Sequence, residues 1–249
     1  MKLGVQTYTI RKIAKKNMDL ALNLLSRKGI TKVEYARLKI DQKHIDILKR
    51  HDFEVLSIQA TYHKLISQRK KMIHFCEQTG CKKVVVSVLP LSAIFGGRKA
   101  LLRFSNQLNK LKDLYLLSDI EVGFHHHDFE FKKIQGQSKF DILFEHTDFE
   151  LKFVIDTYWA YSKDIDLEKL IEKVGHRLMG IHLRDYENIR NKHQDTEVGY
   201  GKIDFHQVIK TARIFKPYLV IEQNTHTPIQ SIEKSRRWLY ENFKLDIET

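Results

Sequence analysis

Residues 151–185 read LKFVIDTYWAYSKDIDLEKLIEKVGHRLMGIHLRD. The stretch begins with a short apolar, β-branched run that contains Asp156 and closes on a second apolar run that contains His182. Between the two runs, apolar residues recur at helical spacing among lysines and glutamates. Short β-branched runs indicate buried strands, and this spacing indicates a helix with one buried face. The stretch therefore predicts two parallel strands joined by a helix.

The same alternation of strand and helix patterns extends outward along the whole chain. Helix-patterned segments such as 18–29 and 98–117 separate the apolar runs, and Gly29, Gly80 and the pair Lys216-Pro217 stand where a helix should end before a strand. The predicted strands number eight, at residues 2–8, 32–37, 54–60, 82–89, 120–127, 151–159, 178–185 and 218–224.

Eight strand–helix units in 249 residues have the size at which a parallel sheet closes into a barrel, about 31 residues per unit. A doubly wound open sheet is the structural alternative. No Gly-x-Gly-x-x-Gly follows the first strand, and no Walker-type phosphate loop occurs. The sequence therefore disfavours the main nucleotide-binding forms of the doubly wound sheet. No linker divides the chain. We predict an α/β protein, a (β/α)8 TIM barrel, as a single domain over residues 1–249, with residues 186–202 as a long loop that acts as a lid.

The chain is strongly basic, with 43 Lys+Arg against 31 Asp+Glu, a net charge of +12 and a sequence pI near 9.5. Such a charge suits an anionic partner such as a nucleic acid, a phosphorylated metabolite or a membrane surface. The basic residues are scattered along the sequence, and we attribute them mainly to lysines on the outer helices. Two cysteines exclude a disulfide framework, and no apolar stretch approaches the roughly 18 residues of a membrane span. We expect a cytoplasmic protein with no membrane partner.

Acids and histidines occupy the C-terminal ends of the last four predicted strands, which in a barrel form the catalytic face. The fifth strand ends in residues 125–127, three histidines, and the next three carry Asp156, His182 and Glu222. Side chains alternate along a strand, so His125 and His127 face one way and the histidine between them the other. An acid could cap the following helix instead. Four consecutive strands with such ends favour a metal site with mixed nitrogen and oxygen ligands.

Six segments form an ordered series of motifs: GVQTYTIR (4–11), GFHHHDFEF (123–131), VIDTYWA (154–160), GIHLRDY (180–186), EVGYGKIDF (197–205) and VIEQN (220–224). Together they resemble the sugar phosphate isomerase/epimerase family, the xylose isomerase-like TIM barrels. The resemblance implies one divalent metal ion, Mn2+, Co2+, Zn2+ or Mg2+, with Asp156, His182 and Glu222 among its ligands. For the ligand from the fifth strand we favour His125, with His127 as the alternative.

The resemblance implies isomerisation or epimerisation of a sugar, a sugar phosphate or a keto-inositol. In that chemistry a base removes the proton next to a carbonyl that the metal ion polarises. Glu222 is the first candidate base, and His127 or Glu130 would serve as a second proton relay. The expected substrate contacts are Tyr8, Gln59, Tyr158, Trp159 and Arg184, with Arg184 either on the substrate or paired with Asp185.

Two departures from the family pattern concern substrate contacts: Tyr200 stands where relatives have an acid, and Gln59 where they often have a histidine. Two other functions therefore stay open. An apurinic-site endonuclease would use the positive charge to follow DNA, although the early strands offer no ligands for a metal cluster. A sugar-binding barrel without catalysis would fit the loss of the acid at Tyr200. We expect a small sugar-derived ligand, no nucleic acid, and a chain that is able to form a homo-oligomer.

Overall fold

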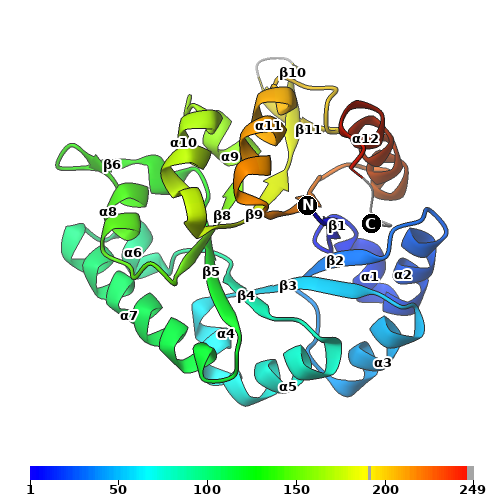
Figure 1. The fold of residues 1–249 in the computed structure, drawn as a ribbon, viewed down its shortest axis with the longest axis horizontal. Coiled ribbons are helices and arrows are strands. Elements are labelled where there is room, and N and C mark those ends of the chain that lie inside the picture. The colour runs from blue at the N-terminus through cyan, green and yellow to red at the C-terminus, as the bar shows by residue number, and fades with distance from the viewer. Residues whose placement is uncertain (190–191, 246–249) are drawn as a thin grey trace.

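The computed structural model describes residues 1–189 and 192–245, and its centre is a closed barrel of parallel strands (Figure 1). Around the barrel the strands follow the order β1-β12-β9-β8-β5-β4-β3-β2. This arrangement confirms the predicted (β/α)8 TIM barrel. The barrel strands are β1 (Leu3–Gln6), β2 (Lys32–Ala36), β3 (Glu54–Ala60), β4 (Lys83–Val86), β5 (Glu121–His125), β8 (Lys152–Asp156), β9 (Leu178–Leu183) and β12 (Tyr218–Ile221).

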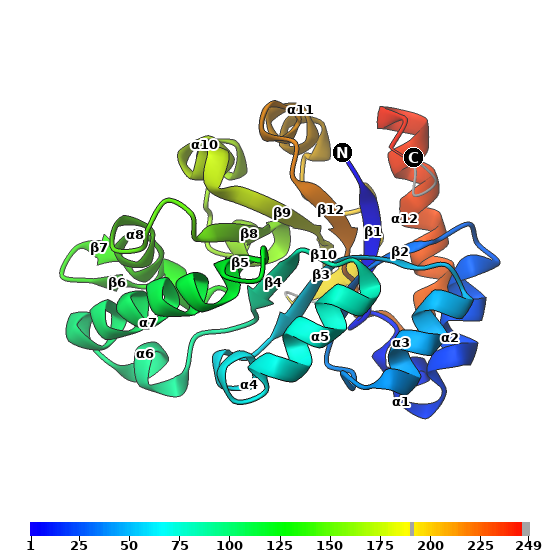
Figure 2. The same cartoon turned by 60° about the horizontal axis from the view of Figure 1, so that its bottom comes forward.

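Helices surround the barrel and cover the outer face of its sheet, as Figures 1 and 2 show. Gly80 ends α5, and Lys216 ends α11, each in a left-handed conformation at the position that the sequence predicts. The helices are α1 (Arg11–Lys16), α2 (Met18–Ser26), α3 (Gln42–Arg50), α4 (Tyr62–Ser67), α5 (Arg69–Thr79), α6 (Leu91–Phe95), α7 (Arg98–Leu116), α8 (Lys139–Glu145), α9 (Thr157–Tyr161), α10 (Leu167–Val174), α11 (Phe205–Phe215) and α12 (Pro228–Phe243), with 3-10 turns η1 (Phe129–Phe131) and η2 (Gly175–Arg177).

The apolar core has two parts, one on each face of the closed sheet. The larger part fills the space between the strands and the helices, where residues such as Leu22, Phe104 and Ile171 are fully or almost fully buried. The smaller part contains residues of barrel strands alone, and therefore fills the barrel interior. It consists of Leu56, Val85, Val154, Met179, Tyr218 and Val220.

Gly180 makes room for the one aromatic ring of the inner cluster. A Cβ atom at this position would lie 2.4 Å from Cζ of Tyr218 on the neighbouring strand, which is closer than real Cβ atoms approach other atoms. The missing side chain therefore lets the Tyr218 ring enter the barrel. Its hydroxyl group donates a hydrogen bond of 2.5 Å to Oε2 of Glu34, another inward residue.

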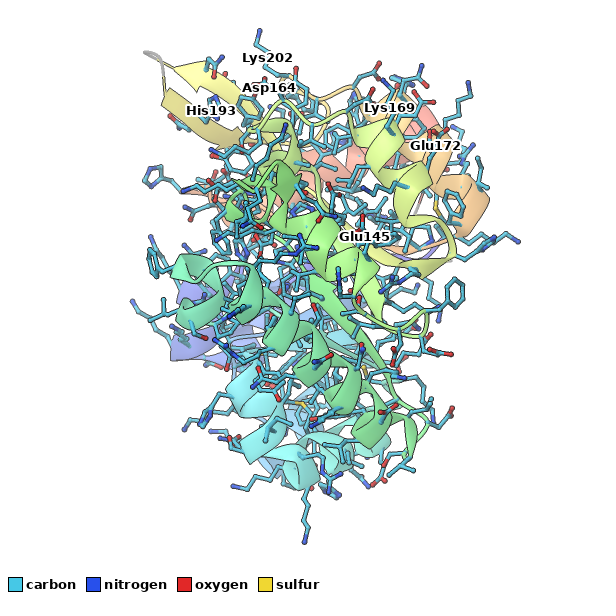
Figure 3. All side chains as sticks on the ribbon, turned by 90° about the vertical axis from the view of Figure 1, so that its left-hand side faces the viewer. Glu145, Asp164, Lys169, Glu172, His193 and Lys202 are labelled. Carbon is cyan, nitrogen blue, oxygen red and sulfur yellow. The ribbon has the colours of Figure 1, made fainter. Side chains whose placement is uncertain are left out.

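Residues 186–202 differ from the predicted long loop, because most of the segment forms an antiparallel hairpin. Its strands are β10 (Asp185–Ile189) and β11 (Lys192–Thr196), and His193 on β11 is labelled in Figure 3. A smaller hairpin follows η1, with strands β6 (Lys133–Ile134) and β7 (Gln137–Ser138). The turn composition of the segment predicts a loop, whereas the ladder that pairs β10 with β11 depends on contacts that sequence patterns do not contain.

The predicted sixth strand, 151–159, is too long, since the chain leaves the sheet at Asp156 and begins α9 at Thr157. Tyr158 and Trp159 therefore lie in a helix, where the alternation of side chains along a strand does not apply. Among the described residues, no helix combines the length and the apolar character that a membrane crossing requires.

Candidate functional site

Four side chains meet at the carboxyl end of the barrel: His125 from β5, Asp156 from β8, His182 from β9 and Glu222 after β12. One ligand atom from each lies within 4.8 Å of the others. Nδ1 of His182 is 2.8 Å from Oε2 of Glu222, and Oδ2 of Asp156 is 3.7 Å from Nε2 of His125. The structure thus brings together all four residues that the sequence selects as metal ligands.

Several buried polar atoms of the cluster have no hydrogen-bond partner within the described part of the chain. Both ring nitrogens of His125 and Oδ2 of Asp156 have no hydrogen-bond partner among the described residues, although both side chains are buried. An unsatisfied buried polar group costs about 1–3 kcal/mol, which a ligand at the centre of the cluster would remove. Two imidazoles and two carboxylates are a donor set that divalent ions such as Zn2+ and Mn2+ accept. The residues therefore fit a divalent metal ion.

Asp156 has a different task for each of its carboxylate oxygens. Oδ1 accepts a hydrogen bond of 3.0 Å from the backbone N–H of Trp159 and caps the N-terminus of α9. Oδ2 faces His125 and His182. Burial alone would raise the pKa of Asp156, but the neighbouring His125 and the charges of Arg184 and His182 hold it below its ordinary value. Helix capping and a ligand-facing oxygen, which are alternatives in the sequence, therefore coexist in one side chain.

Glu34, which the sequence interpretation missed, lies directly beneath the cluster. This fully buried residue of β2 places Oε1 2.7 Å from Nε2 of His182. Since Nε2 faces Glu34, the other ring nitrogen, Nδ1, faces Asp156 and Glu222. A carboxylate in this position accepts from Nε2, which orients the ring and favours the tautomer with its proton on Nε2 and a free lone pair on Nδ1.

Four donors surround the Glu34 carboxylate, so that it is satisfied without water. Oε1 accepts from Gln6 Nε2 and faces His182, while Oε2 accepts from the hydroxyl groups of Ser57 and Tyr218. Burial by itself would raise the pKa of Glu34, but the His182 charge and these hydrogen bonds lower it below the ordinary value. In His182 the balance is the reverse: burial would lower the pKa, and the Glu34 and Glu222 carboxylates raise it.

A signal for Glu34 is present in the sequence. It interrupts the apolar run KVEYA just as Asp156 and His182 interrupt theirs. Glu34 lies three positions before Arg37, the last residue of the predicted strand 32–37, so it is not among the residues at the strand ends. A test for any charge inside a buried strand would have found it.

The other two histidines of the fifth strand lie outside the four-residue cluster. His126 is fully buried on the helix side of the sheet, where its Nε2 accepts from the backbone N–H of Asp156 at 3.1 Å. The His127 ring stacks on Phe129, with centroids 5.3 Å apart. Burial, together with the nearby His125, lowers the pKa of His127 to about 2, so this ring is neutral in the folded protein.

Glu130, the other predicted proton relay, is buried under the turn that follows β5. Its Oε2 accepts a hydrogen bond of 2.8 Å from the backbone N–H of His127, and Oε1 has no partner among the described residues. Burial raises its pKa to about 8, while the hydrogen bond from His127 acts in the opposite direction. In the structure Glu130 braces the His127 backbone.

Arg184 lies over the aromatic pair of α9 and is held by the hairpin. Its guanidinium carbon is 4.3 Å from the centre of the Tyr158 ring and 5.1 Å from that of Trp159. Of the two roles considered for Arg184, the pair with Asp185 is replaced by one with Asp195 on β11, to which Nε and Nη2 each donate a hydrogen bond of 3.0 Å. A bidentate pair of this kind fixes the orientation of the guanidinium plane.

Asp185 instead supports the loop that contains Tyr200. Its carboxylate accepts hydrogen bonds from the backbone N–H groups of Tyr186, Gly199, Gly201 and Ile203. A Cβ atom at Gly201 would lie 2.3 Å from Oδ1 of Asp185, so only glycine fits there. The Tyr200 side chain is 49% exposed, and the ammonium group of Lys234 lies 3.9 Å from its ring centre.

The predicted contacts from the early strands lie around the barrel mouth. Gln59 at the end of β3 is half-buried, its Oε1 is 3.5 Å from Nε2 of Gln6, and its own Nε2 has no partner among the described residues. Tyr8 follows β1, and the Arg11 guanidinium lies 3.9 Å from its ring centre. Arg11 also donates to Oδ1 of Asn224 at 2.7 Å, which links the first and last strands.

Comparison with known proteins agrees with this fold. A sugar phosphate isomerase/epimerase from Parabacteroides distasonis is 20% identical over 98% of this chain and 95% of its own, with a TM-score of 0.81. The IOLI protein with a bound zinc atom is 15% identical, covers 98% of this chain and 100% of its own, and has a TM-score of 0.73.

A third similar structure is an AP endonuclease, family 2, from Brucella melitensis, 13% identical over 97% of this chain and 98% of its own, with a TM-score of 0.73. At such identities the likeness establishes the fold alone. No protein of curated function matches the chain in sequence. The pattern of the xylose isomerase-like TIM barrels matches residues 13–242. The chain therefore belongs to the family of xylose isomerase-like TIM barrels.

Proposed function

We propose that the protein is a divalent-metal-dependent isomerase or epimerase of a sugar or sugar-derived substrate. The observation that carries the proposal is the meeting of His125, Asp156, His182 and Glu222 at the carboxyl end of the barrel, with ligand atoms within 4.8 Å of one another. Active sites of TIM barrels lie at this end. The similar fold of a sugar phosphate isomerase/epimerase and of a zinc-bound protein supports the same assignment.

The four residues would hold one ion, which when bound polarises a carbonyl group and makes a neighbouring C–H bond more acidic. Glu222 would act as the base. Its side chain is 13% exposed, whereas those of Asp156 and His182 are fully buried, so Glu222 is the acid of the cluster that a substrate reaches most easily. Its Oε2 is already close to His182, which leaves Oε1 to take a proton.

A polyol substrate would find both apolar and polar surfaces beside the cluster. Tyr158 and Trp159 offer ring faces for the C–H side of a sugar, and Asp195 holds Arg184 against them. The unpartnered amide nitrogen of Gln59 is a donor for a hydroxyl or carbonyl oxygen. Tyr8 would border the same mouth. Neutral His127, 5.6 Å from Trp159 between ring centres, is the candidate for a second proton transfer.

The decisive experiment follows solvent deuterium into substrates. The purified protein, with Mn2+ added, is incubated in D2O with a panel of ketoses, aldoses and keto-inositols, and exchange at the carbon next to the carbonyl is read by NMR. We expect exchange with at least one compound and none with Glu222→Gln. The control is Glu241→Gln, an exposed acid on α12. Absence of exchange over the whole panel, in a protein that retains its metal, would refute the isomerase assignment.

A further inference from the structure

A second concave site lies away from the four-residue cluster, beside the α1–α2 junction. The cavity has a volume of about 1210 Å3 and is bounded by α1, α2, the loop between β2 and α3, α3 itself and the α4–α5 junction. Figure 2 shows α1, α2 and α3 next to one another at this end of the molecule. None of the four cluster residues lines the cavity, so it is separate from the candidate metal centre.

The cavity wall is far more basic than the chain as a whole. Eight of its 20 lining residues are lysine or arginine, against 43 in the 249-residue chain, and only three are acidic. The wall therefore has an excess of five positive charges. Concave surfaces lined by one sign of charge concentrate the field and attract the opposite ion. Part of the charge that the sequence assigns to scattered surface lysines is thus gathered at one place.

Each of the three acids of the wall already has a partner, and these partners include Arg50, His44 and Gln42 of the wall itself. Asp19 pairs with Arg50 at 2.9 Å and contacts His51 at 3.0 Å, and Asp41 caps α3 while its Oδ1 lies 2.5 Å from His44. Asp46 accepts a hydrogen bond from Gln42 at 2.8 Å. Of the eight basic residues, Arg50 is the one with an ion-pair partner within the described part of the chain. The remaining seven cations are available to an anion.

The loop between β2 and α3 holds two of these cations in fixed positions. Thr7 Oγ1 bonds to both the N–H and the carbonyl group of Ala36, and the Tyr35 hydroxyl donates to the Lys39 carbonyl at 2.5 Å. Between these anchors Leu38 is buried, while Arg37 and Lys39 on either side of it are exposed. The loop therefore packs its apolar residue inward and turns its charged ones to the cavity.

Arg37 has a backbone conformation that side chains rarely adopt. Its φ is 56°, in the left-handed region that favours glycine. A left-handed conformation at a residue other than glycine costs on the order of 1–3 kcal/mol of folding free energy. It persists only where the surrounding structure or a function requires it. The guanidinium carbon lies 5.1 Å from the centre of the Tyr8 ring, at the barrel mouth.

Lys64 brings a further cation to the cavity from α4. It is half-buried, and its ammonium group lies 3.4 Å from the Leu38 carbonyl oxygen, a weak contact for a charged donor. Burial lowers its pKa below the ordinary value. An anion next to Lys64 would compensate for the water that this ammonium group has lost.

We propose that this cavity binds a small polyanion that carries at least two phosphate groups, with Arg37, Lys39, Lys43 and Lys64 as its principal contacts. One phosphate dianion would leave most of the five excess charges unbalanced, whereas a diphosphate or triphosphate matches them. The volume of about 1210 Å3 is slightly above the range of small-molecule pockets, roughly 300–1,000 Å3. A concave site of this size suits a compact ligand better than it suits a nucleic-acid duplex.

The test measures binding of inorganic pyrophosphate and tripolyphosphate to the full chain by calorimetry at low and high salt. We expect one site per chain, with an affinity that falls as salt rises. The triple variant Lys39→Gln/Lys43→Gln/Lys64→Gln should bind about tenfold more weakly or worse, a change of about 1.4 kcal/mol or more. Arg37→Gly should also weaken binding while it keeps the left-handed backbone without strain.

The matched control removes three exposed lysines elsewhere: Lys99→Gln/Lys169→Gln/Lys202→Gln, of which Lys169 and Lys202 are labelled in Figure 3. It should bind pyrophosphate within twofold of the unmodified chain. Equal weakening in both triple variants, or no binding of either probe, overturns the proposal. Tighter binding of a DNA duplex than of tripolyphosphate, lost in the cavity variant, would replace it with a nucleic-acid site. Metal content of the cavity variants should be unchanged, which separates this test from the isomerase proposal.

Discussion

Nε2 of His182 lies 2.7 Å from Oε1 of Glu34, so a carboxylate from the second barrel strand fixes a histidine ring from the seventh. Both side chains are fully buried. The contact turns Nδ1 of His182 toward Asp156 and Glu222, where it completes the four-residue cluster. The geometry of the candidate metal site therefore depends on a residue that would not itself bind the ion.

Glu34→Gln should weaken metal binding without removing a ligand. Glutamine keeps one acceptor oxygen but replaces the other with an NH2 group, which cannot accept a hydrogen bond from the surrounding donors. The His182 ring therefore loses its fixed orientation. Loss of such outer partners reduces metal affinity by about 10–100-fold. The measurement is calorimetric titration with Mn2+, with Glu54→Gln, a partly exposed acid of β3, as control. An affinity equal to that of the unmodified protein would show that Glu34 does not orient His182.

Asp156→Asn and Asp156→Ala should separate helix capping from metal binding. Asparagine retains an oxygen that can cap α9, whereas alanine loses the cap, which costs about 1 kcal/mol. We expect both variants to lose bound metal in elemental analysis, and only the alanine variant to show the lower free energy of unfolding in urea. Glu222→Ala should also lose metal. Full metal retention in the Asp156 and Glu222 variants would eliminate the proposed ligand set.

The barrel could be predicted from the sequence because its signals are local. Each β-branched run and each helical face is encoded in neighbouring residues, and all eight predicted strands end within three residues of their observed ends. His125, Asp156, His182 and Glu222 were predictable because each interrupts an apolar run at the same end of a strand. Strand order then follows from the right-handed crossover rule.

Contacts between distant segments could not be predicted in the same way. Asp195 holds Arg184 through the β10–β11 hairpin, whose pairing no short pattern encodes. The predicted strand 151–159 is too long because the side chain of Asp156 caps a helix that begins at Thr157. Residues from four other strands contact the Glu34 carboxylate. The residues at the strand ends do not reveal this arrangement.

Tyr218→Phe should destabilise the fold through the Glu34 carboxylate. The hydroxyl group is fully surrounded by protein and donates to Glu34 at 2.5 Å, so its removal leaves a buried carboxylate with one donor fewer. Such a loss costs about 1–3 kcal/mol. Urea unfolding at neutral pH measures the free energy, and Tyr240→Phe, 47% exposed on α12, is the matched control. Equal stability of the two variants would mean that the Tyr218 hydroxyl contributes nothing to the network.

Stability should also depend on pH through Glu130. Burial raises the pKa of its carboxyl group to about 8, from an ordinary value of 4.5, against the effect of the hydrogen bond from His127. Between these two pH values the unfolded chain releases a proton that the folded chain retains, so the free energy of unfolding falls as pH rises. The contribution of the neutral carboxyl is complete below pH 4.5 and is lost as pH passes 8.

Glu130→Gln removes this titration, because an amide does not ionise, while its oxygen can still accept from the His127 N–H. Urea unfolding of both proteins at pH 5, 6.5 and 8 should show a stability difference that shifts in favour of the variant as pH rises, by an amount on the order of a few kcal/mol. Asp128→Asn, a neighbouring and more exposed acid, should not reproduce the shift. Parallel pH profiles for the unmodified chain and Glu130→Gln would show that Glu130 is ionised throughout, and that the charge of Lys139 offsets its burial.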